Sequence, residues 1–147
     1  MIGVILIAHM RTASETKATV EYILQEQCAF EAVDVINSDA AHAQSQALEV
    51  SLRTMSEDCE AILVMTDIFG ATPCNIAMNV IVQGDFAADI ELVAGFNIPC
   101  VIKAILERNH HDVKTLAQLS LDAGLKYMRL GSQEAVVKQL FSKSKAA

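Results

Sequence analysis

The stretch Ile2-Gly3-Val4-Ile5-Leu6-Ile7-Ala8, followed directly by His9, decides the fold class. It is apolar throughout and rich in β-branched residues, whereas a strand with one face in water alternates apolar and polar residues. The run is far shorter than the ~20 residues that a membrane-spanning helix needs. It therefore predicts a strand covered on both faces, which is typical of the parallel sheet of an α/β protein.

Three further short runs, rich in apolar and β-branched residues, follow along the chain, and helical patterns separate them. These runs are Ala32–Ile36, Ala61–Met65 and Ile90–Ala94. Thr12-Ala13-Ser14-Glu15 fits a capping box, and Asn37-Ser38-Asp39 supplies capping side chains for the next helix. Strands that alternate with helices predict a doubly wound, mainly parallel four-stranded sheet of order 2-1-3-4, with helices on both faces.

The last third of the chain predicts two more helices, one near Val101–Arg108 and one from about Val113 to Ala123, where Gly124 is the expected stop. Lys126–Leu130 is a candidate for a short antiparallel fifth strand, and its charges favour the sheet edge. We expect one domain over residues 1–131 and a helical or flexible C-terminal tail over residues 132–147.

The charge of the chain excludes some classes of function. Its 147 residues carry a net charge of −7, which weighs against sequence-independent nucleic-acid binding. Between His42 and Ile102 the only basic residue is Arg53, whereas five Lys or Arg and only Glu134 follow Leu125. The N-terminal run lacks the basic flank and cleavage site of a signal peptide, so we expect a cytoplasmic protein without membrane insertion.

The cysteines and three of the histidines predict no metal site. Cys28, Cys59, Cys74 and Cys100 are too far apart for CxxC spacing and are interpreted as buried free thiols. His42 is expected on a helix surface, and the pair His110–His111 in a solvated connection without further ligands.

Polar residues gather in the loops after the first and third strands, which are neighbours in the expected order. Ligands bind beyond the carboxyl ends of such strands, so His9 and Asp67 are expected to face each other there. A carboxylate on one ring nitrogen of an imidazole leaves the lone pair of the other free for nucleophilic attack. The structural alternatives are a hydrogen-bonded histidine at a strand end and an aspartate that caps its own turn.

Thr72-Pro73 predicts a helix start directly after this loop, with Thr72 as the N-cap and Pro73 as the first helical residue. The free N–H groups of a helix N-terminus bind anions. The loop lacks the GxxxxGK[ST] pattern of a nucleotide-binding P-loop. The combination predicts phosphoryl transfer onto a histidine rather than nucleotide hydrolysis.

Three segments carry a resemblance to a known family. They are Ile5-Leu6-Ile7-Ala8-His9, Val64-Met65-Thr66-Asp67-Ile68-Phe69-Gly70-Ala71-Thr72-Pro73-Cys74-Asn75 and Ala94-Gly95-Phe96-Asn97-Ile98-Pro99. The chain resembles, over roughly residues 1–130, the mannose/fructose-type IIA components of the bacterial sugar phosphotransferase system (PTS). By this resemblance, His9 matches the histidine that is phosphorylated in the family, and Asp67 matches the carboxylate that orients this histidine. The resemblance implies phosphate binding by Gly70, Ala71 and Thr72, and places Met10, Phe69 and Asn97 at the flanks of the site.

The resemblance also implies partners. Members accept a phosphoryl group from the phosphocarrier protein HPr and pass it to a IIB component, without a metal or other cofactor. They commonly form homodimers, in which the last strand, here Lys126–Leu130, can be exchanged between subunits.

One departure from the family pattern bears on the activity. Met10 stands where the family usually has Gly, and a side chain there adds bulk beside the histidine. It restricts docking of the donor, reorients the histidine or is simply tolerated. Two alternatives therefore stay open: a regulatory binding module of the same fold that is never phosphorylated, and a phosphoryl donor to a dihydroxyacetone kinase.

Overall fold

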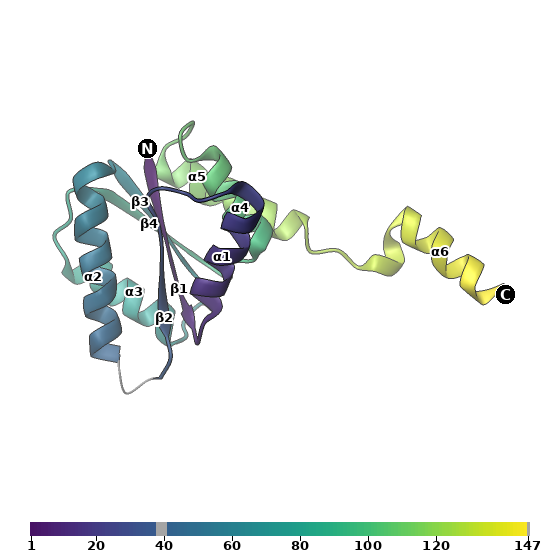
Figure 1. Cartoon of the computed structure of the whole chain (residues 1–147), viewed down its shortest axis with the longest axis horizontal. Helices are drawn as coiled ribbons and strands as arrows, with labels where there is room; N and C mark the ends of the chain where they lie inside the picture. Colours follow the sequence, from purple (N-terminus) through teal and green to yellow (C-terminus); the bar gives the residue numbers. More distant parts are fainter. Residues whose placement is uncertain (38–40, 147) are drawn as a thin grey trace.

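The computed structural model describes residues 1–37 and 41–146. Its four strands are β1 (Ile2–His9), β2 (Phe30–Val35), β3 (Ala61–Thr66) and β4 (Asp89–Ala94). All pair in parallel in the order β2-β1-β3-β4 (Figure 1), which confirms the predicted doubly wound sheet. Of the expected caps before the second helix, Ser38 and Asp39 lie outside the described residues.

Helices cover both faces of the sheet. The helices of the described chain are α1 (Thr12–Leu24), α2 (Ala41–Asp58), α3 (Thr72–Gln83), α4 (Ile98–Glu107), α5 (Val113–Lys126) and α6 (Ala135–Lys145), with a 3-10 turn, η2 (Gly131–Gln133), before α6. The core on one face is formed with α1, α4 and α5, and the core on the other face with α2 and α3. None of these helices combines the length and apolar character needed to cross a bilayer.

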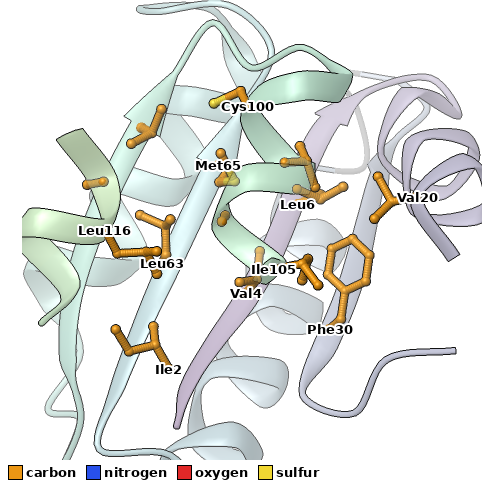
Figure 2. Packing of buried hydrophobic residues seen from close by; sticks show 14 of the residues in the cluster. Ile2, Val4, Leu6, Val20, Phe30, Leu63, Met65, Cys100, Ile105 and Leu116 are labelled. Atoms are coloured by element: carbon orange, nitrogen blue, oxygen red, sulfur yellow. The ribbon is translucent and has the colours of Figure 1, made fainter. Parts of the chain in front are cut away.

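The central strand β1 is buried from Ile2 to Ala8 because both of its faces pack against helices. Figure 2 shows one of the two cores, where Val4 and Leu6 lie near Ile105 of α4. The alternate residues Ile5 and Ile7 belong to the other core, with Leu48 and Leu52 of α2 among its members. Residues of opposite parity point to opposite faces of a strand, so the uninterrupted apolar run fills two cores at once.

The predicted start of α1 and the predicted stop of α5 are wrong. Thr12 is the first residue of α1 rather than its cap, and the start of the helix is held instead by Asp34, whose carboxylate accepts hydrogen bonds from Ser14 N and Oγ at 3.0 and 2.6 Å. Gly124 lies inside α5, where an added Cβ would be 3.1 Å from both Asn97 Oδ1 and Cys100 Cβ. This glycine permits close packing of α5 on α4 and does not stop the helix.

The predicted fifth strand is not formed in this single chain. Lys126 ends α5, and residues 128–130 pair with no strand of the described sheet. Two backbone hydrogen bonds, from Tyr127 N to Ala123 O and from Met128 N to Leu125 O, close the end of the helix. Figure 1 shows the chain then running away from the sheet to α6. A fifth strand would have to pair with an edge of the sheet. The chain runs away from the sheet edges of its own copy, so residues 126–130 have no strand of the described sheet to pair with there.

The cysteines are free thiols, as expected, but their burial differs. Cys59, Cys74 and Cys100 are buried, whereas Cys28 is exposed, so the prediction of burial is wrong for this residue. Burial raises the pKa of the Cys100 thiol to about 11 and raises the pKa of Cys59 as well. These two thiols therefore stay protonated and unreactive near neutral pH.

Candidate functional site

The register of the sheet brings His9 and Asp67 together. Ile7 of β1 is paired with Thr66, the last residue of β3, so Asp67 follows at the level where β1 ends in His9. Since β1 pairs with β2 on one side and β3 on the other, this is the point where the strand order reverses. The predicted meeting of the two residues across 58 positions of sequence is therefore observed.

A single carboxylate oxygen binds His9 twice. Asp67 Oδ2 accepts a hydrogen bond from the His9 backbone N–H at 2.9 Å and lies 2.8 Å from the ring Nδ1. The other oxygen, Oδ1, accepts the backbone N–H of Ile68 at 2.9 Å. The carboxylate thus links the end of β1 to the loop that follows β3.

These contacts define the tautomer of the ring. An ionised carboxylate only accepts hydrogen bonds, so the ring must donate through Nδ1–H. The lone pair of a neutral imidazole then resides on Nε2, which is the nitrogen free to react. The side chain of His9 is 39% exposed and that of Asp67 14%, so the ring is open to a partner while the carboxylate is shielded.

The pKa of Asp67 lies below its ordinary value. Burial by itself raises the pKa of this carboxyl, but the hydrogen bonds from the backbone and ring of His9 and from Ile68 N–H outweigh it. The group is consequently ionised throughout the neutral range, as an orienting carboxylate needs to be.

The loop after β3 holds an unusual backbone conformation that favours glycine. Gly70 has φ +76°, although an added Cβ would meet no atom within 4 Å, so conformation rather than space requires glycine here. Asn75 Nδ2 donates to the Gly70 carbonyl at 3.0 Å and supports the turn.

The start of α3 differs from the prediction by one residue. Ala71 is the N-cap and Thr72 the first helical residue, with Pro73 next, so the prediction of Thr72 as N-cap is wrong. No described side chain caps this helix, and the N–H groups of Gly70 and Thr72 form no hydrogen bond within the described chain. By contrast, Asp34 already occupies the N-terminus of the neighbouring α1. Of the N-termini of α1 and α3, only that of α3 therefore has backbone N–H groups without a side-chain cap among the described residues, and such groups can bind an anion.

Met10 adopts a backbone conformation that favours glycine. Its φ is +53°, in the left-handed region, and its N–H donates to Val35 O at 2.9 Å. A side chain in this conformation costs roughly 1–2 kcal/mol. Met10 is 59% exposed and leaves the His9 ring accessible, so the thioether does not wall off the ring.

Exposed apolar side chains directly follow His9 and Asp67 in the chain. Besides Met10, Ile68 and Phe69 of the next loop are exposed. Transfer between two docked proteins needs no deep cavity at the histidine. A hollow of about 570 Å³ lies at the other end of the strands, between Ile2 and Val113. We did not predict the exposure of Ile68, the residue that directly follows Asp67 in this loop.

Asn97 has a structural role in this molecule. Its side-chain oxygen accepts from Cys100 N at 3.1 Å and caps α4, while Nδ2 donates to the Gly124 carbonyl at 3.0 Å and ties α4 to α5. These bonds do not involve His9, so Asn97 is not brought into the contacts that define the pair.

The other histidines lie apart from the pair. His42 is exposed on α2, and His111 lies 3.4 Å from Glu107 in an ion-pair geometry. Over residues 1–37 and 41–146, no three side chains of the metal-ligating kinds are grouped as a metal site.

Comparison with known proteins identifies the family. The profile of the EIIA-man family, described as the PTS system fructose IIA component, matches residues 3–120. The chain belongs to the EIIA-man family. Among curated proteins, the PTS system fructose-specific EIIA component of Bacillus subtilis is 27% identical over 116 residues, which are 79% of this chain and 77% of that protein.

Solved structures of PTS IIA components share the fold of this EIIA-man member. The Mannose/sorbose specific IIA subunit from Enterococcus faecalis has a TM-score of 0.72 and 26% identity, covering 87% of this chain and 92% of that one. The phosphotransferase system component EIIA from Streptococcus agalactiae has a TM-score of 0.77 and 24% identity, covering 91% and 100%. The chain is thus a PTS EIIA component of the mannose/fructose family.

Proposed function

We propose that this EIIA component is a phosphohistidine carrier. It accepts a phosphoryl group from HPr on His9 in the cytoplasm and passes it to a IIB component, for sugar uptake or its regulation. The observation that carries the proposal is the 2.8 Å contact of Nδ1 with Asp67, which leaves Nε2 on an exposed ring.

The transfer is an exchange of one phosphorus–nitrogen bond for another. The Nε2 lone pair of His9 forms a bond to phosphorus as the bond to the donor's histidine breaks, and that electron pair returns to the donor ring. Positive charge develops on the His9 ring, and Asp67 stabilises it from the Nδ1 side. The acceptor step then repeats the exchange in the opposite direction.

The free N–H groups at the start of α3 are the proposed cradle for the phosphoryl oxygens. Gly70 and Thr72 supply unbonded N–H groups, and the positive end of the helix dipole favours the anion. Positioning and electrostatics account for the catalysis, so this mechanism uses no metal or nucleotide.

The surface around the ring suits protein partners. Met10 follows His9, Ile68 and Phe69 follow Asp67, and all three side chains are exposed. Apolar anchors of this kind at the centre of an interface dominate its binding energy. We further propose that the functional unit is a homodimer, in which Lys126–Leu130 of one copy adds to the open edge of β4 in the other.

The deciding experiment is phosphate incorporation. The full chain is incubated with phosphoenolpyruvate and the phosphodonor proteins, including HPr, and its intact mass is measured. We expect one acid-labile, base-stable phosphate, which His9→Ala abolishes and His42→Ala leaves unchanged. NMR of the labelled ring should place the phosphate on Nε2.

Two outcomes would contradict the proposal. If the wild type takes no phosphate but Met10→Gly does, the protein is a binding module whose histidine is blocked. If phosphate is taken up but passes only to a dihydroxyacetone kinase chain and never to a IIB component, the carrier serves that kinase instead.

A further inference from the structure

The last helix, α6, presents an apolar stripe that the rest of the described chain leaves uncovered. Val136, Leu140 and Phe141 are each more than half exposed, and no residue of the helix is buried. At a helical period these residues and Val137 share one side. Figure 1 shows α6 standing clear of the sheet and its covering helices.

Basic residues flank this stripe. Lys143 lies at one border of the stripe, and Lys138 and Lys145 lie at the other, by their positions on the helical wheel. The chain as a whole carries −7, and the acidic excess lies in the part before α6. A basic amphipathic helix of this kind fits an apolar surface with an acidic border.

Such a surface lies between α3 and β4. Met78, Ile81 and Val82 of α3 and Ile90 and Leu92 of β4 line a hollow of about 210 Å³ together with Glu91. Val82 is 83% exposed at its rim. Asp85 and Asp89, both exposed, precede or begin the same strand and add acidic groups to this end of the sheet.

We propose that α6 of one copy docks into the α3–β4 groove of a second copy of this chain. This docking proposal rests on the homodimer proposed above, in which Lys126–Leu130 is exchanged between copies. It adds a second contact, made by α6, which follows the exchanged strand. Val136, Leu140 and Phe141 would cover Ile81, Val82 and Ile90, while the flanking lysines face Asp85, Asp89 and Glu91.

The dimensions of the chain permit this contact. Residues 127–134 span at most ~28 Å when extended, enough to follow the six residues of β4, at ~3.3 Å each, and to reach the acidic end of the groove. The eleven residues of α6 measure about 16 Å, close to the length of the strand that they would accompany. Figure 1 shows the chain leaving α5 in a direction away from its own sheet, and for this reason the proposal places the groove in another copy.

The test measures the dimer dissociation constant of the full chain by sedimentation. Leu140→Asp on α6 and Val82→Asp in the groove should each weaken the dimer about tenfold or more. The matched controls are Gln139→Asp, off the apolar stripe of α6, and Gln83→Asp, beside Val82 but outside the groove lining. Both should leave the dissociation constant nearly unchanged. Hydrogen exchange should show protection of α6 amides that rises with protein concentration.

Several results would overturn the proposal. A dimer whose affinity Leu140→Asp and Val82→Asp do not change would show that α6 is not part of it, with phosphate uptake on His9 unaffected. Protection of α6 that is independent of concentration would mean docking within one chain. Binding to anionic phosphatidylglycerol vesicles that only Leu140→Asp abolishes, with an unchanged dimer, would assign the helix to a membrane surface. A chain that stays monomeric at all concentrations would refute the docking proposal as well. The proposal of phosphate uptake on His9 would be unaffected, because the phosphate-incorporation assay tests it separately.

Discussion

The backbone N–H and the ring Nδ1 of His9 both converge on Oδ2 of Asp67, at 2.9 and 2.8 Å. Two bonds from one residue to one oxygen define the rotation of the ring relative to the end of β1. The same carboxylate therefore accepts the backbone N–H at the end of β1 and orients the ring so that Nε2 is the nitrogen free to react.

The first prediction concerns this carboxylate. Asp67→Asn keeps the shape but removes the charge that holds Nδ1–H and stabilises the charged ring, so we expect phosphate incorporation about 100-fold slower. Rapid-quench measurement of labelled protein gives the rate. Asp34→Asn is the control, because Asp34 holds α1 in a similar way without touching His9. A wild-type rate in Asp67→Asn would exclude the carboxylate from the transfer.

The second prediction is a pH dependence of stability. Since the pKa of Asp67 is lower in the folded protein than the ordinary value, its ionised form stabilises the fold above the pKa of the unfolded chain, about pH 4. The contribution is lost as the pH falls through the lower folded pKa. Urea unfolding at several pH values should show the largest difference between wild type and Asp67→Asn above about pH 5. A difference that grows on acidification would reverse the sign and refute the assignment.

The third prediction concerns Met10. Met10→Gly removes the cost of a left-handed side chain but adds freedom to the unfolded chain, so we expect the free energy of unfolding to rise by at most about 1 kcal/mol. Thermal and urea unfolding measure this. Arg11→Gly is the control, because Arg11 has φ −100° and no such strain to release, so this variant should be less stable than wild type. Loss of stability in Met10→Gly would mean that side-chain contacts outweigh the backbone cost.

The fourth prediction separates structure from chemistry at Asn97. Asn97→Ala removes the cap of α4 and the bond to Gly124, so the free energy of unfolding should fall by about 1–2 kcal/mol. The rate of phosphate incorporation should change little at a temperature where the variant is folded. A large loss of rate without loss of stability would instead make Asn97 part of the site.

The central part of the fold and the meeting of His9 with Asp67 could be predicted from sequence, because both follow from regular parallel pairing. An apolar run without alternation needs cover on both faces, and parallel strands end at the same edge. That rule alone brings His9 and Asp67 together. Met10 has a positive φ, which is consistent with the glycine that the resemblance implies at this position.

Three of the errors fall where distant residues decide local structure. Thr12 fits a capping box, yet the Asp34 carboxylate at the end of another strand takes over the start of α1. Gly124 has the sequence features of a helix stop, yet it lies inside α5. Asn97 and Cys100 pack so closely against this position that they leave little room for a side chain. The residues 126–130 have a strand-like pattern without a partner strand in their own chain. Such outcomes depend on tertiary contacts that local patterns do not contain.

The burial of β1 has one more consequence. The residue proposed to receive phosphate ends the strand that has a neighbour on each side and a core on each face. Local fluctuations open loops and edges far more readily than such a strand, so we expect the amides of β1 to exchange mainly through global opening. On heating, we therefore expect the ability to take up phosphate to disappear at the melting transition itself and not before it.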